Sequence, residues 1–442
     1  MKLLKLVIIS ACLFSLSGCQ FTLQEFPRYD LELKLPETNR GKDIFVFLDG
    51  TATKKATRSN VWRMFEALRS ERNPNTRSIY IEGVGASSAL LTGTVLGRGM
   101  EIRVSKAYRY IAKSYEPGDR IFIYGYSRGA HQARALAGLI SYAGIIQPTA
   151  SEIVAKKDTI LRSKANSVIE FVKDQKDDYS LWANWNGENP LRKQIQKKIN
   201  ERYNPDGPDE ISMRPAEIHF LGLWDNAPGS MFKSFSSGKS GITLKHPVTG
   251  VQAEAPCKED VDTTQPERYK LDSYPAIKKI VHAVAVEEKR SHFSEVLVCK
   301  AMDESKTIVK QQWFPGSHGD VGGGYSDDNT RIDGHFYDSL STNALNWMAI
   351  ETAETSVAWQ GYTFRNIDIN RKVSAKALAH LSITDFPKNF ASKCIDRALP
   401  VDPEYYSEIH LQRAGLETAP IKISKRKVKK DLAYPVLCGD WK

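Results

Sequence analysis

The chain is built around Ile121-Phe-Ile-Tyr-Gly-Tyr-Ser-Arg-Gly-Ala-His-Gln-Ala-Arg-Ala-Leu136. Its first part, Ile121 to Tyr124, is apolar throughout, which predicts a strand buried on both faces. It then passes through Gly125-Tyr-Ser-Arg-Gly129 into an alanine-rich stretch with the pattern of a helix. A G-x-S-x-G motif between a strand and a helix is typical of a sharp turn that exposes its serine, here Ser127, above a sheet.

The two glycines of this motif have a steric reason. The turn brings Gly125 and Gly129 so close together that neither position has room for a Cβ, and Ser127 is left on a strained backbone. The start of the following helix offers free N–H groups and a positive dipole end. We therefore expect Ser127 to be a nucleophile and the Arg128 amide to stabilise an oxyanion. A plain strand-to-helix turn without chemistry is the alternative.

Strands and helices alternate along the first three quarters of the chain. This alternation predicts a doubly wound, mostly parallel sheet with flanking helices. Ligands of such sheets bind beyond the carboxyl ends of the strands, which puts Asp49-Gly-Thr51 and Ser127 on one rim. The expected strands are 43–48, 78–82, 217–223 and 307–313 besides the Ser127 strand, and the expected helices are 60–70, 100–115, 275–289 and 338–354.

The sequence predicts further divisions of the chain. A connection longer than the sheet needs is charged and helical in pattern, which indicates a cap. The pattern weakens near the C-terminus, which we interpret as an appendage. The predicted divisions are a lipoprotein signal peptide at 1–18, a tether at 19–42, an α/β-hydrolase-like catalytic domain at 43–360 with a helical cap insertion at 146–213, and a C-terminal appendage at 361–442.

The N-terminus has the features of a secretory signal: a basic start, a short apolar stretch and small residues at its end. Leu16-Ser-Gly-Cys19 resembles a bacterial lipobox, after which Cys19 becomes the acylated first residue. Gln20 is not acidic, which by the same resemblance implies the outer membrane, facing the periplasm. An ordinary signal peptide with an incidental Cys19 is the alternative.

The 442-residue chain carries a net charge of +10. In the periplasm nucleic acid is not an expected partner, so the excess favours an anionic membrane surface. Beyond the signal lie Cys257, Cys299, Cys394 and Cys438, which permit two disulfides in any of three pairings, or four buried thiols. Their spacing does not match a metal knuckle, so we expect no metal.

A serine hydroxyl needs a base within hydrogen-bond reach, and the base needs a carboxylate to orient it. In α/β-hydrolases these groups follow one another as serine, acid and histidine. Asp225 and His318 satisfy this order, and each follows a predicted strand on the Ser127 rim. The amide of Gly50 or Thr51 could supply a second oxyanion donor.

Other residues compete for these roles. His282 falls in the predicted helix 275–289 among apolar residues, so we expect a core histidine. His131 lies within the helix after Ser127 and is expected at the surface. Asp320 is two residues from His318 and is expected to order its own loop. Asp49 is better placed to shape the oxyanion loop than to orient a base.

Five motifs together resemble the α/β-hydrolase-like family that includes type VI secretion phospholipase effectors. The resemblance runs from about residue 43 to 354. It implies esterase or phospholipase A activity on glycerophospholipids without a cofactor, and Ser127, Asp225 and His318 as the triad. The motifs are Phe47-Leu-Asp-Gly-Thr51, Ser59-Asn-Val61, Gly125-Tyr-Ser-Arg-Gly-Ala130, Leu221-Gly-Leu-Trp-Asp225 and Trp313-Phe-Pro-Gly-Ser-His-Gly-Asp-Val-Gly-Gly-Gly-Tyr325.

Secreted effectors usually lack a lipobox, so the lipobox favours a resident enzyme of the envelope. The expected function is thus a lipid-anchored serine hydrolase, a phospholipase A or lipase, with membrane phospholipid as both substrate and surface. Two alternatives stay open. One is an esterase or thioesterase for a soluble substrate, and the other is a non-catalytic envelope lipoprotein that binds a partner protein.

Overall fold

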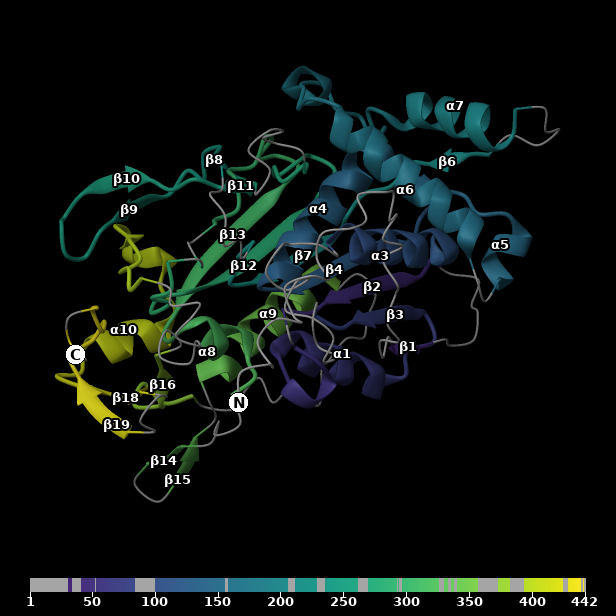
Figure 1. Cartoon of the computed structure of the whole chain (residues 1–442). Helices are drawn as coiled ribbons and strands as arrows, with labels where there is room; N and C mark the ends of the chain where they lie inside the picture. The colour runs from purple at the N-terminus through teal and green to yellow at the C-terminus, as the bar shows by residue number, and fades with distance from the viewer. Residues whose placement is uncertain are drawn as a thin grey trace, which may run out of the picture.

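A computed structural model of the chain (Figure 1) shows a sheet with helices on both faces. The residues that the structure describes are 31–33, 41–51, 53–83, 100–155, 158–205, 211–228, 235–260, 269–291, 293, 296–325, 330–332, 335–337, 340–356, 373–381, 393–423, 428–438 and 440.

The sheet has seven strands among the described residues, and its first strand in spatial order is the one that runs against the others. β1 pairs antiparallel with β3, and every later pair is parallel. The prediction of an α/β-hydrolase-like, mostly parallel sheet is confirmed. In spatial order the strands are β1 (Leu31–Leu33), β3 (Thr76–Ile81), β2 (Asp43–Leu48), β4 (Arg120–Tyr126), β7 (Phe220–Trp224), β12 (Lys279–Ala285) and β13 (Ile308–Phe314).

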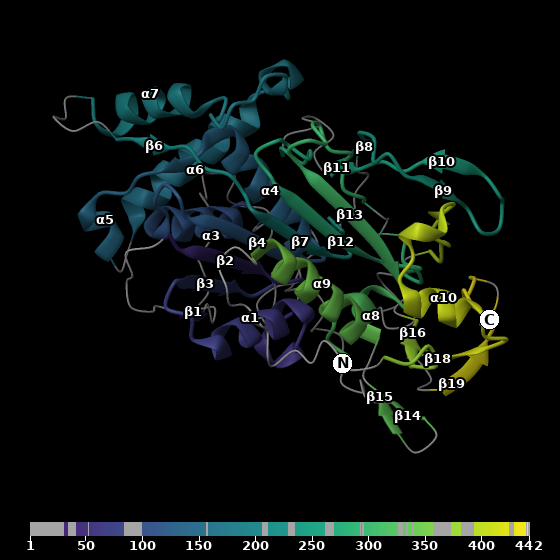
Figure 2. The same cartoon turned by 180° about the vertical axis from the view of Figure 1, so that it is seen from behind.

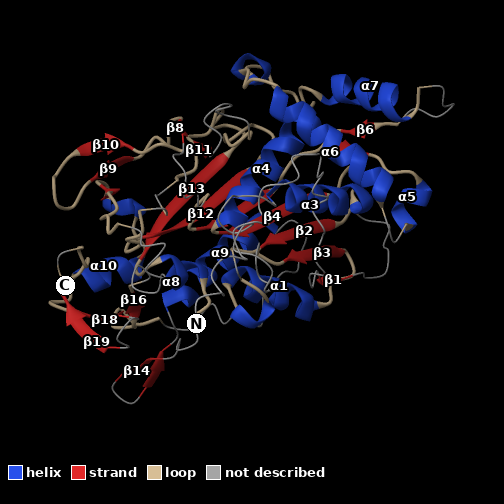
Figure 3. Ribbon diagram, viewed as in Figure 1, coloured by secondary structure: helices blue, strands red, loops and turns tan. Residues whose placement is uncertain are grey.

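Helices cover the two faces because the central strands are apolar on both sides. On β2, Ile44, Val46 and Leu48 join the core beneath α3 (Met100–Ser114) and α4 (Arg128–Ala143), while Phe45 and Phe47 join the core beneath α1 (Asn60–Glu71) and α9 (Leu340–Ser356). Ser59 caps α1 by accepting a hydrogen bond from the Trp62 amide at 3.2 Å, as its position predicts. Figure 3 shows the strands of the sheet flanked by these helices.

The helices that follow α4 pack over α3 and α4. Trp182 is buried there, edge-on to Tyr142 and tilted against Tyr274. In Figures 1 and 2 this group lies at the far end of the molecule from the C-terminal elements. Its members are β5 (Ile145–Ile146), α5 (Ala150–Val154), α6 (Thr159–Asp174), η2 (Tyr179–Trp182), α7 (Arg192–Tyr203) and β6 (Met213–Arg214).

The predicted helix at 275–289 is wrong, because β12 occupies its centre. The run Lys279-Ile-Val-His-Ala-Val-Ala285 is buried along its whole length and pairs in parallel with β7 and β13. A strand buried on both faces has no alternation of polar and apolar residues, so its pattern is easily taken for a buried helix. The β-branched valines and isoleucine favour the strand.

Short strands follow β7 in the polar stretch 226–270. They form two antiparallel pairs, β8 with β11 and β9 with β10. A strand from the C-terminal part of the chain, β17, pairs with the other side of β9. A disulfide between Cys257 and Cys299 closes this stretch onto the segment before β13. The strands are β8 (Phe235–Ser237) with β11 (Lys258–Asp260), and β10 (Gln252–Glu254) with β9 (Thr243–Lys245) and β17 (Leu399–Pro400).

The C-terminal elements lie beside α8 in both views (Figures 1 and 2). They have a small core of their own, which Leu340 of α9 joins, and a second disulfide links Cys394 to Cys438. These elements are β16 (Ala379–His380), η6 (Pro403–Tyr405), α10 (Glu408–Ala414), β18 (Ala419–Ile423) and β19 (Val428–Leu432); η1 (Lys55–Thr57), α8 (His318–Gly322), β14 (Thr330–Ile332) and β15 (His335–Tyr337) complete the described set.

No helix in the described ranges has both the length and the apolar character to cross a bilayer. The predicted signal peptide and Cys19 lie outside the described residues, as does most of the predicted tether, apart from β1 and residues 41–42. The boundaries predicted for the cap and the appendage stay predictions.

Candidate active site

Ser127 occupies the one-residue turn between β4 and α4. It has φ 58° and ψ −126°, a left-handed conformation that a serine adopts only when its surroundings impose it. Its amide donates to the carbonyl of Trp224 at 3.0 Å, and its carbonyl accepts from the Ala130 amide at 3.0 Å. The side chain is 5% exposed. Backbone bonds on both sides therefore hold the serine at the end of the strand.

The flanking glycines meet the steric demand expected of them. A Cβ on Gly125 would lie 2.3 Å from the carbonyl oxygen of Gly129, and a Cβ on Gly129 would lie 2.1 Å from that of Leu48. Both obstacles are backbone atoms, which cannot rotate away as a side chain does. The turn therefore requires glycine at both positions.

Asp225 reaches the same edge through the strand register. β4 and β7 are neighbours, and Tyr126 pairs with Trp224, the last residues of the two strands. Ser127 and Asp225 are therefore the next residues along two adjacent parallel strands. Asp225 also has a positive φ, 36°. Its side chain is buried, 1% exposed.

His318 is the first residue of α8, four positions after β13 ends. Two consecutive glutamates beyond β12 hold this connection. Glu287 accepts from the Gly316 amide at 2.9 Å, and Glu288 accepts from the His318 amide at 3.2 Å. The ring of His318 then packs 4.6 Å from the ring of Tyr126, the residue before Ser127. The sequence placed His318 in a glycine-rich loop, whereas the residue begins a short helix there.

The side chains of His318 and Asp225 contact each other directly. Nδ1 of His318 lies 2.5 Å from Oδ2 of Asp225. Burial lowers the pKa of His318, although Asp225 opposes this effect, so the imidazole is neutral at neutral pH. Burial raises the pKa of Asp225, but the charge of Arg397 and the bond to His318 outweigh it and hold that pKa well below its usual range. A neutral imidazole beside an ionised carboxylate is the state that a general base requires.

The other ring nitrogen of His318 is unused. Within the described part of the chain, Nε2 is buried and has no hydrogen-bond partner, and the hydroxyl of Ser127 has none either. Hydrogen bonds between catalytic groups are often long in ligand-free enzymes and tighten when substrate binds. No hydrogen bond joins Nε2 to the Ser127 hydroxyl in this structure, while the ring lies beside Tyr126, the residue before Ser127.

The loop after β2 supplies the candidate oxyanion donors. The Gly50 amide donates to Oδ1 of Asp49 at 2.8 Å, so it is engaged. No hydrogen bond of the Thr51 amide is present among the described residues, and the Thr51 hydroxyl accepts from Nε of Arg128. The Arg128 amide belongs to the first residue of α4. The side chains of Thr51 and Arg128 thus meet at the start of this helix, where the helix dipole is positive.

Asp49 orders that loop. Its Oδ2 accepts from the Ser59 hydroxyl at 2.6 Å and from the Tyr80 hydroxyl at 2.5 Å. Burial raises the pKa of Asp49, while these hydrogen bonds partly offset the effect. No hydrogen bond among the described residues joins Asp49 to His318, so Asp49 does not orient that ring.

Of the two competing histidines, His282 has both ring nitrogens hydrogen-bonded, whereas Nδ1 of His131 is buried without a partner among the described residues. Nε2 of His282 accepts from the Asn226 amide at 3.1 Å, and its Nδ1 lies 3.1 Å from Oε1 of Gln311, as in a satisfied core histidine. His131 was expected at the surface, but it is 5% exposed on α4, since this helix is covered by the segments that follow it. Burial lowers the pKa of His131 to about 3.

Asp320 forms a second histidine–carboxylate pair. It caps α8 by accepting from the Ser317 amide at 2.9 Å, as expected for a residue that orders its own loop. Its Oδ1 also lies 2.7 Å from Nδ1 of His380, on β16, and Tyr325 stacks on that histidine at 3.8 Å. This pair fastens the C-terminal elements to α8.

Sequence reasoning missed two residues that contact the site. Glu288 and Arg397 have no motif around them, and Arg397 lies in the segment whose role the sequence did not reveal. Glu288 makes a two-pronged ion pair with Arg290 at 2.7 and 2.8 Å, and although burial raises its pKa, Arg290 lowers it to about 2. Arg397 follows Asp396 in a weakly patterned region, and nothing in the sequence there marks the arginine as buried.

The cysteines are paired as Cys257 with Cys299 and Cys394 with Cys438, one of the three pairings left open. Among the described residues, metal-ligand side chains gather at Cys257, Asp272 and Cys299, and there the two sulfurs are bonded to each other. That group therefore offers no thiolate to a metal ion.

A comparison with protein families gives a match over most of the chain. The family model for the type VI secretion system (T6SS) phospholipase effector, Tle1-like, catalytic domain matches residues 42–351. A curated relative, "Uncharacterized protein YEL023C" of Saccharomyces cerevisiae, is 26% identical over 135 residues, which are 26% of this chain and 20% of the relative. The chain therefore spans about a fifth of the length of that relative.

Solved structures give weaker likenesses. An uncharacterized protein from Pseudomonas aeruginosa is 17% identical with a TM-score of 0.34, over 76% of this chain and 49% of that one. The Tle1 effector bound to the VgrG spike of the type 6 secretion system is 18% identical with a TM-score of 0.24, over 66% and 52%. The chain spans about half the length of each. At these TM-scores neither likeness bears on the activity.

Proposed function

Because the chain belongs to the Tle1-like phospholipase effector catalytic-domain family through residues 42–351, we propose that it is a lipid-anchored serine hydrolase that cleaves carboxylic ester bonds of membrane phospholipids. In this proposal it acts as a phospholipase A or lipase. Ser127 is the nucleophile, His318 the general base and Asp225 the residue that orients the base.

One observation carries the proposal. The Asp225 carboxylate binds Nδ1 of His318 at 2.5 Å. The opposite nitrogen of that ring has no partner among the described residues, and the ring packs beside Tyr126, next to the strained Ser127. His131 and His219 also have a buried ring nitrogen without a partner among the described residues, so an unused nitrogen alone does not mark a general base. What supports His318 is the carboxylate on its Nδ1 together with its place beside the Ser127 turn.

The reaction follows from these roles. Nε2 of His318 takes the proton of the Ser127 hydroxyl as Oγ attacks the ester carbonyl, and the amides of Arg128 and Thr51 bind the resulting oxyanion. The imidazolium returns its proton to the leaving lysophospholipid or alcohol, which leaves an acyl group on Ser127. Water, deprotonated by the same nitrogen, then releases the fatty acid and restores the serine.

The anchor would set where this chemistry happens. Acylation of Cys19 would hold the enzyme at the periplasmic face of the outer membrane, where ester substrate is concentrated. Each acyl chain contributes about 0.8 kcal/mol per buried CH₂, so several chains retain a protein firmly. The lipobox distinguishes a resident envelope enzyme from exported cargo. Cys19→Ser should move the protein from the membrane fraction to the soluble fraction, and unchanged membrane retention would contradict the anchor.

The decisive experiment treats the purified protein with a fluorophosphonate probe and with phospholipid vesicles. Wild type should become labelled and release fatty acid, and Ser127→Ala should do neither. Ser141→Ala is the matched control, because Ser141 is fully buried on the same helix and its hydroxyl donates to the Ala137 carbonyl, at 2.8 Å. Folded wild type that resists the probe would overturn the serine mechanism and favour a binding protein.

Whether the substrate is monomeric or in micelles distinguishes a phospholipase from an esterase for soluble substrates. Turnover should rise when a short-chain ester passes from monomers to micelles, because an envelope lipase acts at an interface. Equal turnover on both forms would favour an esterase or thioesterase for a soluble substrate instead.

A further inference from the structure

Arg397 lies where no motif predicted a functional residue, and its guanidinium faces the buried carboxylate of Asp225. One terminal nitrogen donates to Oδ1 at 2.7 Å, and the other donates to Oδ2 at 3.2 Å. The same carboxylate accepts from the Ala285 amide at 2.9 Å and contacts Nδ1 of His318 at 2.5 Å. Its two oxygens are thus held between an imidazole, a backbone amide and a planar cation.

We propose that Arg397 is a positioning residue for the Asp225–His318 pair, and that the disulfide between Cys394 and Cys438 keeps Arg397 in place. The inference deepens the proposed hydrolase function and rests on it for its kinetic consequences. It makes the C-terminal part of the chain a working component of the site.

The first step is the rigidity of the guanidinium. Besides the carboxylate, its terminal nitrogens donate to the carbonyls of Ala285 at 2.8 Å and of Phe293 at 2.7 Å. The side chain is buried, with 3% of its surface exposed. A planar group bound to acceptors on three separate residues has a single orientation, and it transmits that orientation to the carboxylate. A lysine could keep the charge but not this two-pronged geometry.

The second step is electrostatic. A buried carboxylate without a counter-charge is costly, and it relieves the cost by taking a proton or turning toward water. A protonated or turned Asp225 would no longer fix the proton of His318 on Nδ1, and the ring could then present the wrong nitrogen to Ser127. The cation of Arg397 lowers the pKa of Asp225 against the effect of burial and so keeps the carboxylate ionised in the productive orientation.

The third step is the anchorage of Arg397 itself. Its segment binds alongside Lys289 and Arg290: the Ile395 amide donates to the Lys289 carbonyl at 3.0 Å, and Lys289 pairs with Asp396 at 2.9 Å. Cys394 forms an isolated antiparallel β-bridge with Arg290 through the backbone, and its sulfur is bonded to that of Cys438. The amide of Cys438 donates a hydrogen bond to the Asp396 carboxylate at 3.0 Å. The disulfide spans 44 positions, so it closes the C-terminal elements around the segment that carries the arginine.

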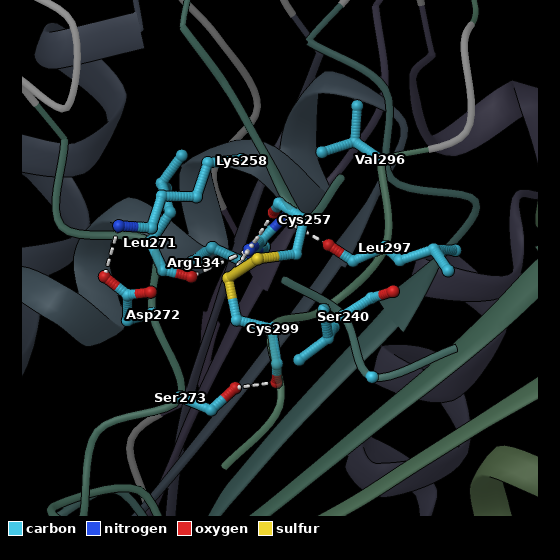
Figure 4. Close-up of a disulfide and its surroundings, with 12 residues drawn as sticks. Arg134, Ser240, Cys257, Lys258, Leu271, Asp272, Ser273, Val296, Leu297 and Cys299 are labelled. Carbon is cyan, nitrogen blue, oxygen red and sulfur yellow. Dashed lines mark hydrogen bonds and ion pairs between the residues drawn. A yellow bond between two sulfur atoms is a disulfide. The ribbon is translucent and has the colours of Figure 1, made fainter. Parts of the chain in front are cut away.

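The other disulfide offers a matched comparison. Cys257 and Cys299 are separated by 42 positions and lie around Arg134 of α4, which donates to the carbonyls of Cys257 and Leu271, both at 2.7 Å (Figure 4). No hydrogen bond among the described residues joins this arginine to Asp225. Loss of the two disulfides should therefore have different effects. Loss of Cys394–Cys438 removes a support of Arg397 and so of Asp225, whereas loss of Cys257–Cys299 loosens the segment around α4 and lowers stability.

The test compares Arg397→Gln and Arg397→Lys with Arg413→Gln. Arg413 is fully buried in the same C-terminal part and donates to the carbonyls of Ala375, Ala377 and Pro420, so its loss reports structural damage alone. Turnover is expressed per fluorophosphonate-reactive site, which removes unfolded protein from the comparison. Arg397→Gln should lose about ten- to a hundredfold in kcat, as when a partner behind an active-site group is removed. Arg397→Lys should recover part of that loss, and Arg413→Gln should match wild type.

The pH profile supplies a readout that structural damage would not move. Among the described residues, the charged or titratable groups facing the His318 ring and its partner are Asp225, Arg397, Glu288, Arg290, Tyr126 and, near Asp225, His282. Removing the positive charge of Arg397 leaves more uncompensated negative charge near the imidazole, so the acidic limb of kcat/KM should move to higher pH. An unmoved limb together with wild-type kcat per reactive site would overturn the positioning role.

The disulfide arm uses Cys394→Ser/Cys438→Ser beside Cys257→Ser/Cys299→Ser. The first pair should reproduce the kinetic loss and the pH shift of Arg397→Gln, and the second should lower thermal stability without moving the pH limb. Equal behaviour of the two pairs would refute the part assigned to Cys394–Cys438.

A proton NMR measurement keeps this inference separate from the proposed function. The Nδ1 proton of His318, bound to Asp225, should give a far-downfield resonance in wild type that Arg397→Gln shifts or abolishes and Arg413→Gln preserves. Wild type without esterase activity would end the hydrolase proposal, and the resonance would still decide the positioning role. A resonance unchanged in Arg397→Gln would end the positioning role.

Discussion

The turn at Ser127 and the C-terminal residues 373–440 contribute to the candidate site in opposite ways. Ser127 is placed by its own neighbours: the strand before it, the helix after it and two glycines that let the chain turn. Arg397 touches Asp225 from 172 positions away, and His380 touches Asp320 from 60 positions away. One contribution is local, and the other exists only after the chain has folded.

The two parts of the site therefore depend on different features of the fold. A strained turn keeps its geometry as long as the sheet is intact, because the opposing atoms are backbone atoms. A carboxylate held by a distant arginine depends on every contact that carries the arginine, including a disulfide. Damage to the turn should therefore appear as loss of fold, whereas damage to the C-terminal contacts should appear first in the chemistry of the base.

The largest contrast is between the two histidine–carboxylate pairs. His318→Ala should lower kcat by about 10⁴-fold or more, because the general base is lost. His380→Gln removes the ring from a pair of the same chemistry, so it should lower thermal stability and cost less than about tenfold in kcat. Steady-state kinetics beside thermal unfolding checks both.

If His380→Gln lost as much turnover as His318→Ala, the role of base would not belong to His318 alone. A His318→Ala variant with wild-type turnover would remove it from the triad altogether.

Alanine at two glycines, one in each part of the chain, tests the strain of the turn. Gly129→Ala places a Cβ 2.1 Å from the Leu48 carbonyl oxygen, and the free energy of unfolding should fall by about 3 kcal/mol, the upper end of overpacking costs. A Cβ on Gly415 would lie 3.4 Å from the Gln412 carbonyl oxygen, an ordinary contact, and the residue has an ordinary φ, so with Gly415→Ala stability should hold or rise by about 0.4–1 kcal/mol. Urea unfolding of both variants measures the difference, and equal stabilities would contradict a sterically closed turn.

A smaller effect is expected at the oxyanion loop. Asp49→Asn keeps the shape but removes one acceptor from the set that serves Gly50, Ser59 and Tyr80. We expect kcat to fall by about tenfold, less than the roughly 10²–10³ lost when an oxyanion donor is deleted, because the Thr51 and Arg128 amides remain. Asp402→Asn, an exposed helix cap in the C-terminal part, is the control and should be silent. Unchanged kcat in Asp49→Asn would show that the order of this loop does not affect catalysis.

The smallest expected effect is a shift of the acidic limb of the pH–rate profile of the wild-type protein. Burial lowers the pKa of His318, and the active form is the neutral imidazole. Activity should therefore persist below the usual histidine pKa of about 6.5 and fall only as the pH drops through the lowered value. The dependence of kcat/KM on pH measures it. A limb above about 6.5 would mean that the charge of Asp225, and not burial, dominates the environment of the ring.

Part of the site was readable from the sequence because it follows from strand ends. Ser127 and Asp225 come directly after buried apolar runs, and parallel neighbours in register bring such residues together. His318 was found by its order along the chain, although it begins a helix and not an open loop. The helix expected around His282 was wrong, since a strand buried on both faces carries no alternation to mark it.

The linear chain was sufficient to specify the turn at Ser127, the parallel sheet and the edge where the candidate triad would assemble, because those features depend on local sterics and on hydrophobic period. Folding in three dimensions was needed to bring Arg397 onto Asp225, to lay Glu288 under the His318 amide and to choose the cysteine pairs. Contacts between residues so far apart leave no periodic trace in a single sequence, since each depends on the packing of everything between them.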